Sequence, residues 1–154
     1  MRQKAKRAPG RIYLDHNAST PLAPEVASVM SACLEETFGN PSSSHFAGEA
    51  AKKAVEHARL KVAELIGASP EEIIFTSGGT EANNMAILGT ARRFKSGHII
   101  TSCTEHPSVL NPLKHLEDTG FEVTYLPVDR YGLVNPRDVA SNIKNNTILI
   151  TIMH

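Results

Sequence analysis

The sequence has 154 residues, which is enough for one domain with its own buried core. Hydrophobic residues make up 41% of the chain and charged residues 21%, an ordinary globular composition. Sixteen basic residues balance sixteen acidic ones, so the net charge gives no electrostatic footprint for nucleic acid. No apolar run is long enough to cross a membrane.

The first eleven residues, MRQKAKRAPGR, carry five basic side chains and no acidic one. No apolar stretch follows them, so they do not form a secretory signal. We interpret residues 1–11 as a disordered basic arm, with a transit peptide as the alternative. The two cysteines, Cys33 and Cys103, have no metal-binding spacing and are too few for a disulfide framework, which favours a reducing, cytoplasmic setting.

Two helices are predicted in the first half of the chain. The first begins near Pro24 and is stopped by Gly39-Asn40-Pro41, while the second runs from about Ala47 to Ile66 and has Gly67 as its cap. The apolar residues of the first helix recur at helical spacing and predict a buried face that includes Cys33. They are Val26, Val29, Met30, Cys33, Leu34 and Phe38.

From residue 73 onward, strand patterns alternate with helix patterns. The predicted strands are 73–76, 99–102, 121–128 and 147–153, and the predicted helices are 80–94, 107–118 and a short one that starts at Pro136. This alternation predicts an α/β fold with a mainly parallel sheet flanked by helices on both faces. The last strand, TILITIM, is apolar enough to be buried on both sides. Because a buried strand is a poor place for a terminus, we expect a truncated part of a larger domain.

The stretch FTSGGTEANN joins a predicted strand to a predicted helix. Helix N-termini bind anions, and Gly78 and Gly79 would let backbone N–H groups approach a phosphate closely, with the Thr80 hydroxyl as a further donor. The spacing fits neither a Walker A loop, which needs a lysine, nor the dinucleotide fingerprint GxGxxG. Two interpretations remain from these residues alone, a phosphate site and a plain glycine turn capped by threonine.

His106 follows a predicted strand in TSCTEHPSV, which places it at the carboxyl edge of the sheet, where ligands bind in open α/β folds. A neutral imidazole there could stack on a heteroaromatic ring, although a lone histidine is more often an ordinary loop residue. The seven histidines show no HxxxH or HExxH spacing, so no metal site is predicted.

Five stretches together resemble the N-terminal part of the cysteine desulfurases, a family of pyridoxal-phosphate enzymes within the class V aminotransferases. In chain order they are IYLDHNASTPLAPEV, GNPSSSH, EEIIFTSGGTEANNMAI, HIITSCTEHPSVL and FEVTYLPVD followed by TILITIMH. The resemblance implies that residues 12–154 are the incomplete N-terminal part of the large domain of a fold type I transferase. It further implies PLP-dependent removal of sulfur from L-cysteine, giving L-alanine and an enzyme persulfide for iron–sulfur cluster assembly.

The resemblance also implies site residues. Gly79 and Thr80 match positions that bind the cofactor phosphate, and His106 matches the histidine that stacks on the pyridine ring. Gly78, Asn17 and Asn40 match less directly. The last two belong to loops, Asp15 to Thr20 and Asn40 to Ser44, that match the region near the substrate mouth and the dimer contact.

Several family features have no match in this sequence. The Asn-Asn-Glu segment that follows TIMH in the family is missing, and the only glutamine is Gln3, so the motif that pairs with the pyridine nitrogen is absent too. None of the eight lysines follows a histidine, as the cofactor-binding lysine does, and neither cysteine matches the catalytic one. We therefore expect the lysine and the catalytic cysteine beyond His154, and no activity from these residues alone.

The resemblance implies a homodimer that acts on L-cysteine and delivers sulfur to an acceptor or scaffold protein, with no nucleic acid or membrane partner. Two alternatives stay open. The chain could be the corresponding part of a selenocysteine lyase, or a non-catalytic truncated product that acts as an interaction module.

Overall fold

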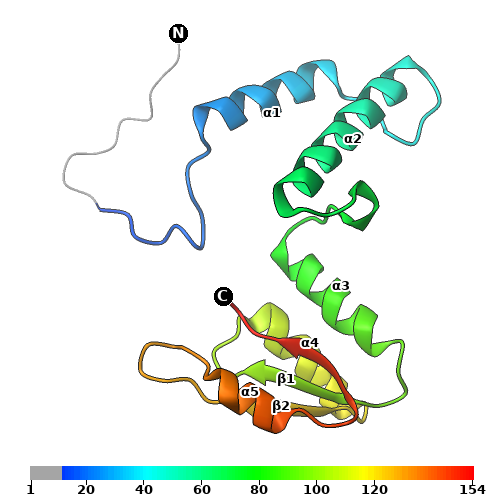
Figure 1. The fold of residues 1–154 in the computed structure, drawn as a ribbon. Coiled ribbons are helices and arrows are strands. Elements are labelled where there is room, and N and C mark those ends of the chain that lie inside the picture. The colour runs from blue at the N-terminus through cyan, green and yellow to red at the C-terminus, as the bar shows by residue number, and fades with distance from the viewer. Residues whose placement is uncertain (1–11) are drawn as a thin grey trace. The chain divides into compact units, whose positions relative to one another are not determined.

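The computed structural model describes residues 12–154, so the basic arm predicted at residues 1–11 lies outside the described part. The chain divides into two compact units, which meet between Ile73 and Ile74 and are described one at a time (Figure 1). Within residues 12–154, none of the helices combines the length and the apolarity that a membrane span requires.

The first unit contains the two predicted helices. Helix α1 spans Pro24–Glu36 with the proline in its first turn, and α2 spans Phe46–Ile66. Gly67 ends α2 in the left-handed conformation (φ 68°), which confirms it as the C-terminal cap. A short 3₁₀ helix, η1, follows at Pro70–Glu72.

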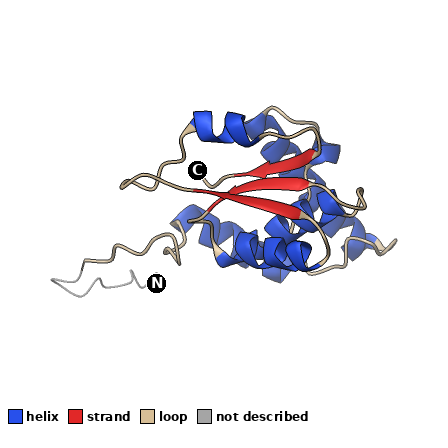
Figure 2. Cartoon of the chain, turned by 90° about the horizontal axis from the view of Figure 1, so that it is seen from below, coloured by secondary structure: helices blue, strands red, loops and turns tan. Residues whose placement is uncertain are grey.

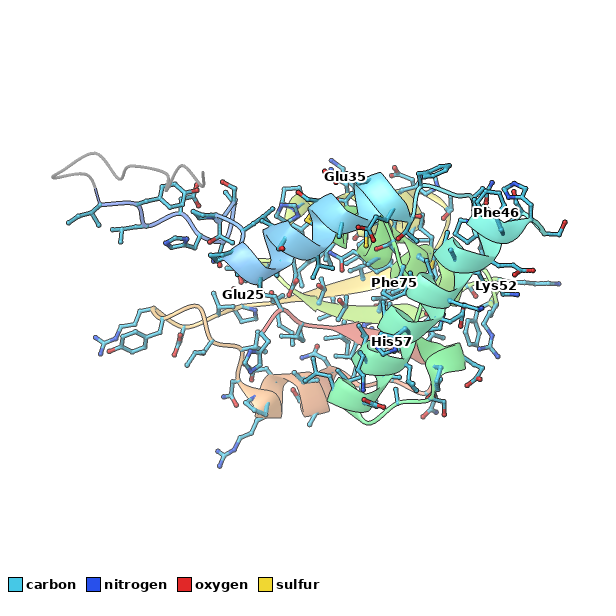
Figure 3. The ribbon with its side chains drawn as sticks, turned by 90° about the horizontal axis from the view of Figure 1, so that it is seen from above. Glu25, Glu35, Phe46, Lys52, His57 and Phe75 are labelled. Atoms are coloured by element: carbon cyan, nitrogen blue, oxygen red, sulfur yellow. The ribbon has the colours of Figure 1, made fainter. Side chains whose placement is uncertain are left out.

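The apolar face of α1 is exposed within this unit. No residue of the helix is buried, and Leu34 and Val29 are 78% and 63% exposed. Cys33 is also exposed, so the prediction that it is a core residue is wrong. The side chains along α1 and α2 are drawn in Figure 3, where Phe46 marks the start of α2. Helical spacing predicted the helix correctly, but burial also needs a packing partner, and this unit supplies none.

Two glycines allow the loop before α2 to fold back tightly on the first turn of that helix. A Cβ on Gly39 would overlap the carbonyl group of Ala47, and a Cβ on Gly48 would overlap the carbonyl oxygen of Ser43. The loop is held by the Ser43 N–H, which donates to the Asn40 carbonyl at 2.9 Å. The backbone approach therefore requires glycine at both positions.

The second unit is an α/β layer that begins with α3, Gly79–Ala91. It continues with β1 at His98–Ser102, α4 at Pro107–Asp118, β2 at Glu122–Leu126, α5 at Pro136–Asn142 and β3 at Thr147–Thr151. The three strands are parallel in the order β2-β1-β3, which confirms the predicted parallel sheet. Helix α4 matches its prediction at both ends.

The predicted strand at 73–76 is wrong. These residues belong to no strand of the described sheet, and Ile74 and Phe75 are 65% and 49% exposed. An extended segment becomes a strand only where a neighbouring strand completes its backbone ladder. β3 is also less buried than its apolar sequence predicts. Four of its five residues are half-buried, and Ile150 is 43% exposed.

The core of the second unit lies between the sheet and two helices. Ile99 of β1 is fully buried against α3 and α4. The cluster contains Ile87, Ala91, Ile99, Val109, Leu113 and Leu116. Helix α5 covers the opposite side of the sheet, as Figures 1 and 2 together show, so the predicted flanking of the sheet on both faces is confirmed.

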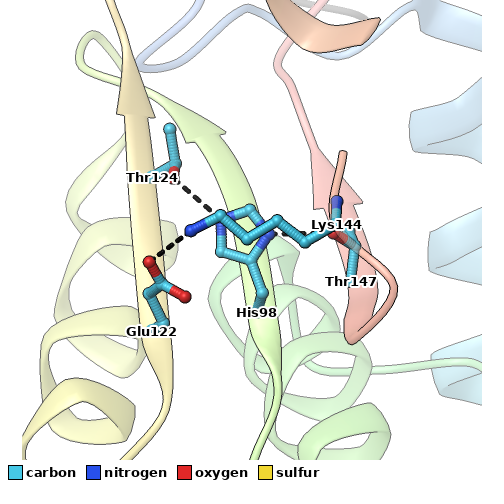
Figure 4. Close-up of polar contacts among 5 residues, drawn as sticks. All are labelled: His98, Glu122, Thr124, Lys144 and Thr147. Carbon is cyan, nitrogen blue, oxygen red and sulfur yellow. Dashed lines mark hydrogen bonds and ion pairs between the residues drawn. The ribbon is translucent and has the colours of Figure 1, made fainter. Parts of the chain in front are cut away.

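A polar bridge crosses the sheet at the amino end of β1 (Figure 4). The imidazole of His98 is fully buried, and its Nδ1 and Nε2 atoms each lie 2.8 Å from a threonine hydroxyl, that of Thr147 on β3 and that of Thr124 on β2. Burial lowers the pKa of His98 below its ordinary value, and the positive charge of Lys144 lowers it further, against the opposing effect of Glu122. Lys144 and Glu122 form an ion pair beside the imidazole.

We expect His98 to make the unfolding of the second unit sensitive to acid. Because its pKa is lower in the folded state, the unfolded chain binds more protons, and stability is lost as the pH falls below about 6.5. The His98→Leu variant should lose about 1–3 kcal/mol at neutral pH, since the Thr124 hydroxyl loses its partner and the Thr147 hydroxyl keeps only the N–H of Lys144. Its stability should depend less on pH. Urea unfolding midpoints, measured from neutral pH to below about 6.5, report both the loss of stability and its dependence on pH. An equally steep acid dependence in the variant would contradict the assignment.

Candidate functional site

The candidate site is an open groove of about 510 Å³ in the second unit, which runs along α3 and α4 from their first turns toward their last. It is lined by Thr80, Asn84, Leu88, His106, Pro107, Ser108, Asn111, Pro112 and His115. β1 ends at Ser102, and the chain reaches α4 through the loop that carries His106. The loop therefore lies at the carboxyl edge of the sheet, where open α/β sheets bind ligands.

The turn before α3 presents backbone donors. Gly78 is the N-cap residue of α3, and no side chain caps the helix there. The first N–H groups of a helix have no partner within it, and the helix dipole adds partial positive charge at this end. A Cβ on Gly78 or Gly79 would meet no atom within 4 Å. Contacts within the chain thus do not require glycine here, and the bare backbone leaves space for a ligand anion.

Glu81 stabilises the same turn through hydrogen bonds to Ser77. Its Oε2 atom accepts hydrogen bonds from the Ser77 hydroxyl at 2.7 Å and the Ser77 N–H at 2.6 Å. These bonds, the side-chain one first, lower the pKa of the Glu81 carboxyl below its ordinary value. Because its carboxylate reaches back to Ser77, it does not cap Gly79 or Thr80.

His106 is the N-cap residue of α4. Its Nδ1 atom accepts the N–H of Ser108 at 3.1 Å and lies 2.8 Å from the Ser108 hydroxyl. The side chain is exposed at the groove. A histidine in this place satisfies one of the unpaired N–H groups of the helix and leaves the rest of its ring free to contact a ligand.

Sequence reasoning missed the residue that joins the two helices. Asn83 of α3 donates from its Nδ2 atom to the Ser108 hydroxyl at 2.8 Å, and it is half-buried. The two residues stand 25 positions apart, so no local pattern signals the contact. It links the helix that presents Thr80 to the residue that holds His106.

Glu105 was also not predicted as a site residue, although it fixes the loop of His106. It is 6% exposed, and its Oε1 atom accepts hydrogen bonds from the Ser102 hydroxyl at 2.8 Å and the Met153 N–H at 2.7 Å. One carboxyl group therefore ties the segment after β3 to the loop after β1.

The structure brings some predicted residues together and not others. Thr80 and His106 line one groove, and Gly78 and Gly79 directly precede Thr80. Asn17 and Asn40 belong to the first unit, where the Asn40 Oδ1 atom accepts the Ser42 N–H at 2.9 Å. Cys103 is exposed after β1, and its N–H donates to the Leu126 carbonyl.

The sequence pattern of the family described as aminotransferase class-V matches residues 12–154. Among curated relatives, the cysteine desulfurase IscS of Dictyoglomus turgidum is 55% identical over 145 residues, which cover 93% of this chain and 37% of the relative. IscS of Azotobacter vinelandii is 51% identical over 148 residues, with the same coverage of both chains. A mitochondrial cysteine desulfurase of Arthroderma benhamiae is 52% identical and is covered to 29%.

Solved structures give the same picture. A NifS-like protein superposes with a TM-score of 0.88 at 39% identity, over 93% of this chain and 40% of that one. SspA in complex with cysteine gives a TM-score of 0.86 at 44% identity, over 91% of this chain and 41% of that one. The chain thus spans between 29% and 41% of the length of these proteins.

Proposed function

The chain belongs to the aminotransferase class-V family, and from this premise we propose that it is the phosphate- and ring-binding part of a cysteine desulfurase. The observation that carries the proposal is the shared groove, which is lined both by Thr80, in the uncapped first turn of α3, and by His106. The desulfurase names of relatives about 50–55% identical support the choice of reaction.

The residues of the groove fit pyridoxal phosphate. The backbone N–H groups of Gly79 and Thr80 and the Thr80 hydroxyl would bind its phosphate, and His106 would stack on its ring. When bound, the cofactor supplies the electron sink that cleavage of the carbon–sulfur bond of L-cysteine requires. Gly78, Asn17 and Asn40 are assigned weaker contacts with the cofactor or with the region near it.

Other parts of such an enzyme are assigned outside residues 12–154. No lysine follows a histidine here, and neither exposed cysteine lines the groove. We therefore assign the cofactor-binding lysine and the sulfur-accepting cysteine to sequence beyond His154. The whole protein is proposed to be a homodimer that passes sulfur to an acceptor protein, and residues 12–154 to be the first part of its cofactor-binding domain.

A binding experiment on the 154-residue chain tests the proposal. Pyridoxine 5′-phosphate lacks the aldehyde, so it cannot form imines with surface lysines. Adding it to the ¹⁵N-labelled protein should shift the amide signals of Gly79 and Thr80, whereas pyridoxine without phosphate should not. Thr80→Ala should weaken binding about tenfold through loss of a hydrogen bond to a charged group.

The matched control is Thr90→Ala, near the opposite end of the same helix. It should bind the phosphorylated ligand as the wild type does. Amide shifts that are equal for the two ligands, or a Thr80→Ala variant that binds normally, would overturn the phosphate assignment. L-Cysteine added to this chain with pyridoxal phosphate should yield no L-alanine, because the lysine and cysteine of the reaction are assigned elsewhere.

A further inference from the structure

The hydrogen bonds around Ser108 have a defined direction. The amide nitrogen of Asn83 can only donate, so the Ser108 hydroxyl accepts from it at 2.8 Å. The single hydrogen of that hydroxyl is then available to the Nδ1 atom of His106, 2.8 Å away. The side chains therefore form a directed chain from Asn83 through Ser108 to His106.

The same chain fixes the tautomer of His106. Its Nδ1 atom faces two donors, the hydroxyl and the backbone N–H of Ser108, the latter at 3.1 Å. A nitrogen that accepts from two donors carries no proton of its own, so the proton of the neutral imidazole is on Nε2. The two bonds also oppose rotation of the ring about its Cβ–Cγ bond.

The two residues that hold the imidazole of His106 are more buried than the imidazole itself. Ser108 is 8% exposed, and Asn83 is half-buried where α3 packs on α4. Asn83 stands one turn after Thr80 on α3. The helix that begins at the phosphate turn is therefore the helix that orients the imidazole.

We propose that Asn83 and Ser108 are positioning residues that set the ring plane and the Nε2–H tautomer of His106 for a stacked heteroaromatic ligand. The inference rests on the proposed function for the identity of that ligand. The polar side-chain atoms of Asn83 and Ser108 bind each other and His106 instead of the ligand. Their effect on the ligand is therefore transmitted through His106.

The test reads the imidazole directly. In the 154-residue chain labelled with ¹⁵N-histidine and free of ligand, the Nδ1 signal of His106 should be that of an unprotonated nitrogen. The Nε2 signal should be that of a protonated nitrogen. Ser108→Ala removes the hydroxyl donor, and Asn83→Leu removes the bond that directs it. Each variant should move both signals part of the way toward the average of two tautomers, because the backbone N–H of residue 108 still favours an unprotonated Nδ1 atom. Ser108→Thr keeps the hydroxyl and should restore the wild-type signals.

Asn142→Ala is the matched control, because Asn142 lies on α5 outside the groove and its Nδ2 atom donates to the Asp138 carbonyl instead. It should leave both His106 signals in place. The two positioning variants should also bind pyridoxine 5′-phosphate about fivefold more weakly, as expected for loss of one hydrogen bond.

Different results would contradict the positioning role and the proposed function. Unchanged imidazole signals in Ser108→Ala and Asn83→Leu, or a protonated Nδ1 atom in the wild type, would overturn the positioning role. Failure of the wild type to bind the phosphorylated ligand would instead overturn the proposed function, because the imidazole signals are recorded without ligand.

Discussion

Gly48→Ala is expected to detach the loop before α2 and to cost about 2–3 kcal/mol of stability in the first unit. The added Cβ would overlap the Ser43 carbonyl oxygen and would lie 2.8 Å from that of Asn40. Both atoms are backbone, so relief requires movement of the loop itself. Hydrogen exchange of the Ser43 amide, which is bonded to the Asn40 carbonyl, should accelerate together with a fall in the unfolding temperature.

The same substitution at Gly89 provides the control. Gly89 lies inside α3, and a Cβ there would meet nothing within 4 Å. Gly89→Ala should therefore be neutral or should stabilise the chain by up to about 1 kcal/mol, as the helix propensity of alanine predicts. A Gly48→Ala variant that behaves like Gly89→Ala would show that the tight backbone approach does not exist in solution.

Glu105→Ala is expected to cost the second unit about 3 kcal/mol and to release the segment after β3. The substitution leaves two donors without their acceptor, the buried hydroxyl of Ser102 and the N–H of Met153. Each such loss typically costs about 1–3 kcal/mol. Urea unfolding measures the stability, and hydrogen exchange of the Met153 amide measures the release.

Glu105→Gln separates the hydrogen bonds from the general effect of substitution. Its amide oxygen can still accept from both donors, so it should lose about 1 kcal/mol or less, with slow exchange at Met153. If alanine and glutamine at this position gave equal stability and equal exchange, the two hydrogen bonds would not be what holds the segment.

The elements best predicted from the sequence are those with chemical boundaries in the chain. Helix α4 starts at Pro107, whose ring suits the first helical turn, and ends before Gly120, which takes a left-handed φ of 98°. The cap of α5 is another case, since the Asn135 side chain accepts the Arg137 N–H at 3.0 Å. Such signals depend on neighbouring residues alone, so the sequence contains them in full.

Features that need a distant partner were predicted less well. The apolar residues at 73–76 have strand character but no neighbouring strand in the described sheet, and Cys33 follows a helical pattern whose face is exposed. Propensity indicates what a segment can form, while pairing and packing decide what it forms.

The candidate site shows the same division. The uncapped start of α3 and the place of His106 after β1 followed from local patterns and strand order. The link from Asn83 to Ser108 and the role of Glu105 depend on contacts across 25 and 48 positions. Those contacts exist only once the helices and strands have packed.

The strand order β2-β1-β3 also determines the order in which the strands can pair during translation. β1 is synthesised before the other two strands but occupies the centre of the sheet. It can therefore pair with β2 and pack against α4 before β3 has been synthesised. During the translation of residues 127–151, about 1–5 s at typical rates, one edge of β1 has no neighbour. An unpaired edge is the usual starting point for aggregation. Codons or chaperones that change the pace over this interval should therefore affect the yield of folded protein more than changes elsewhere in the second unit.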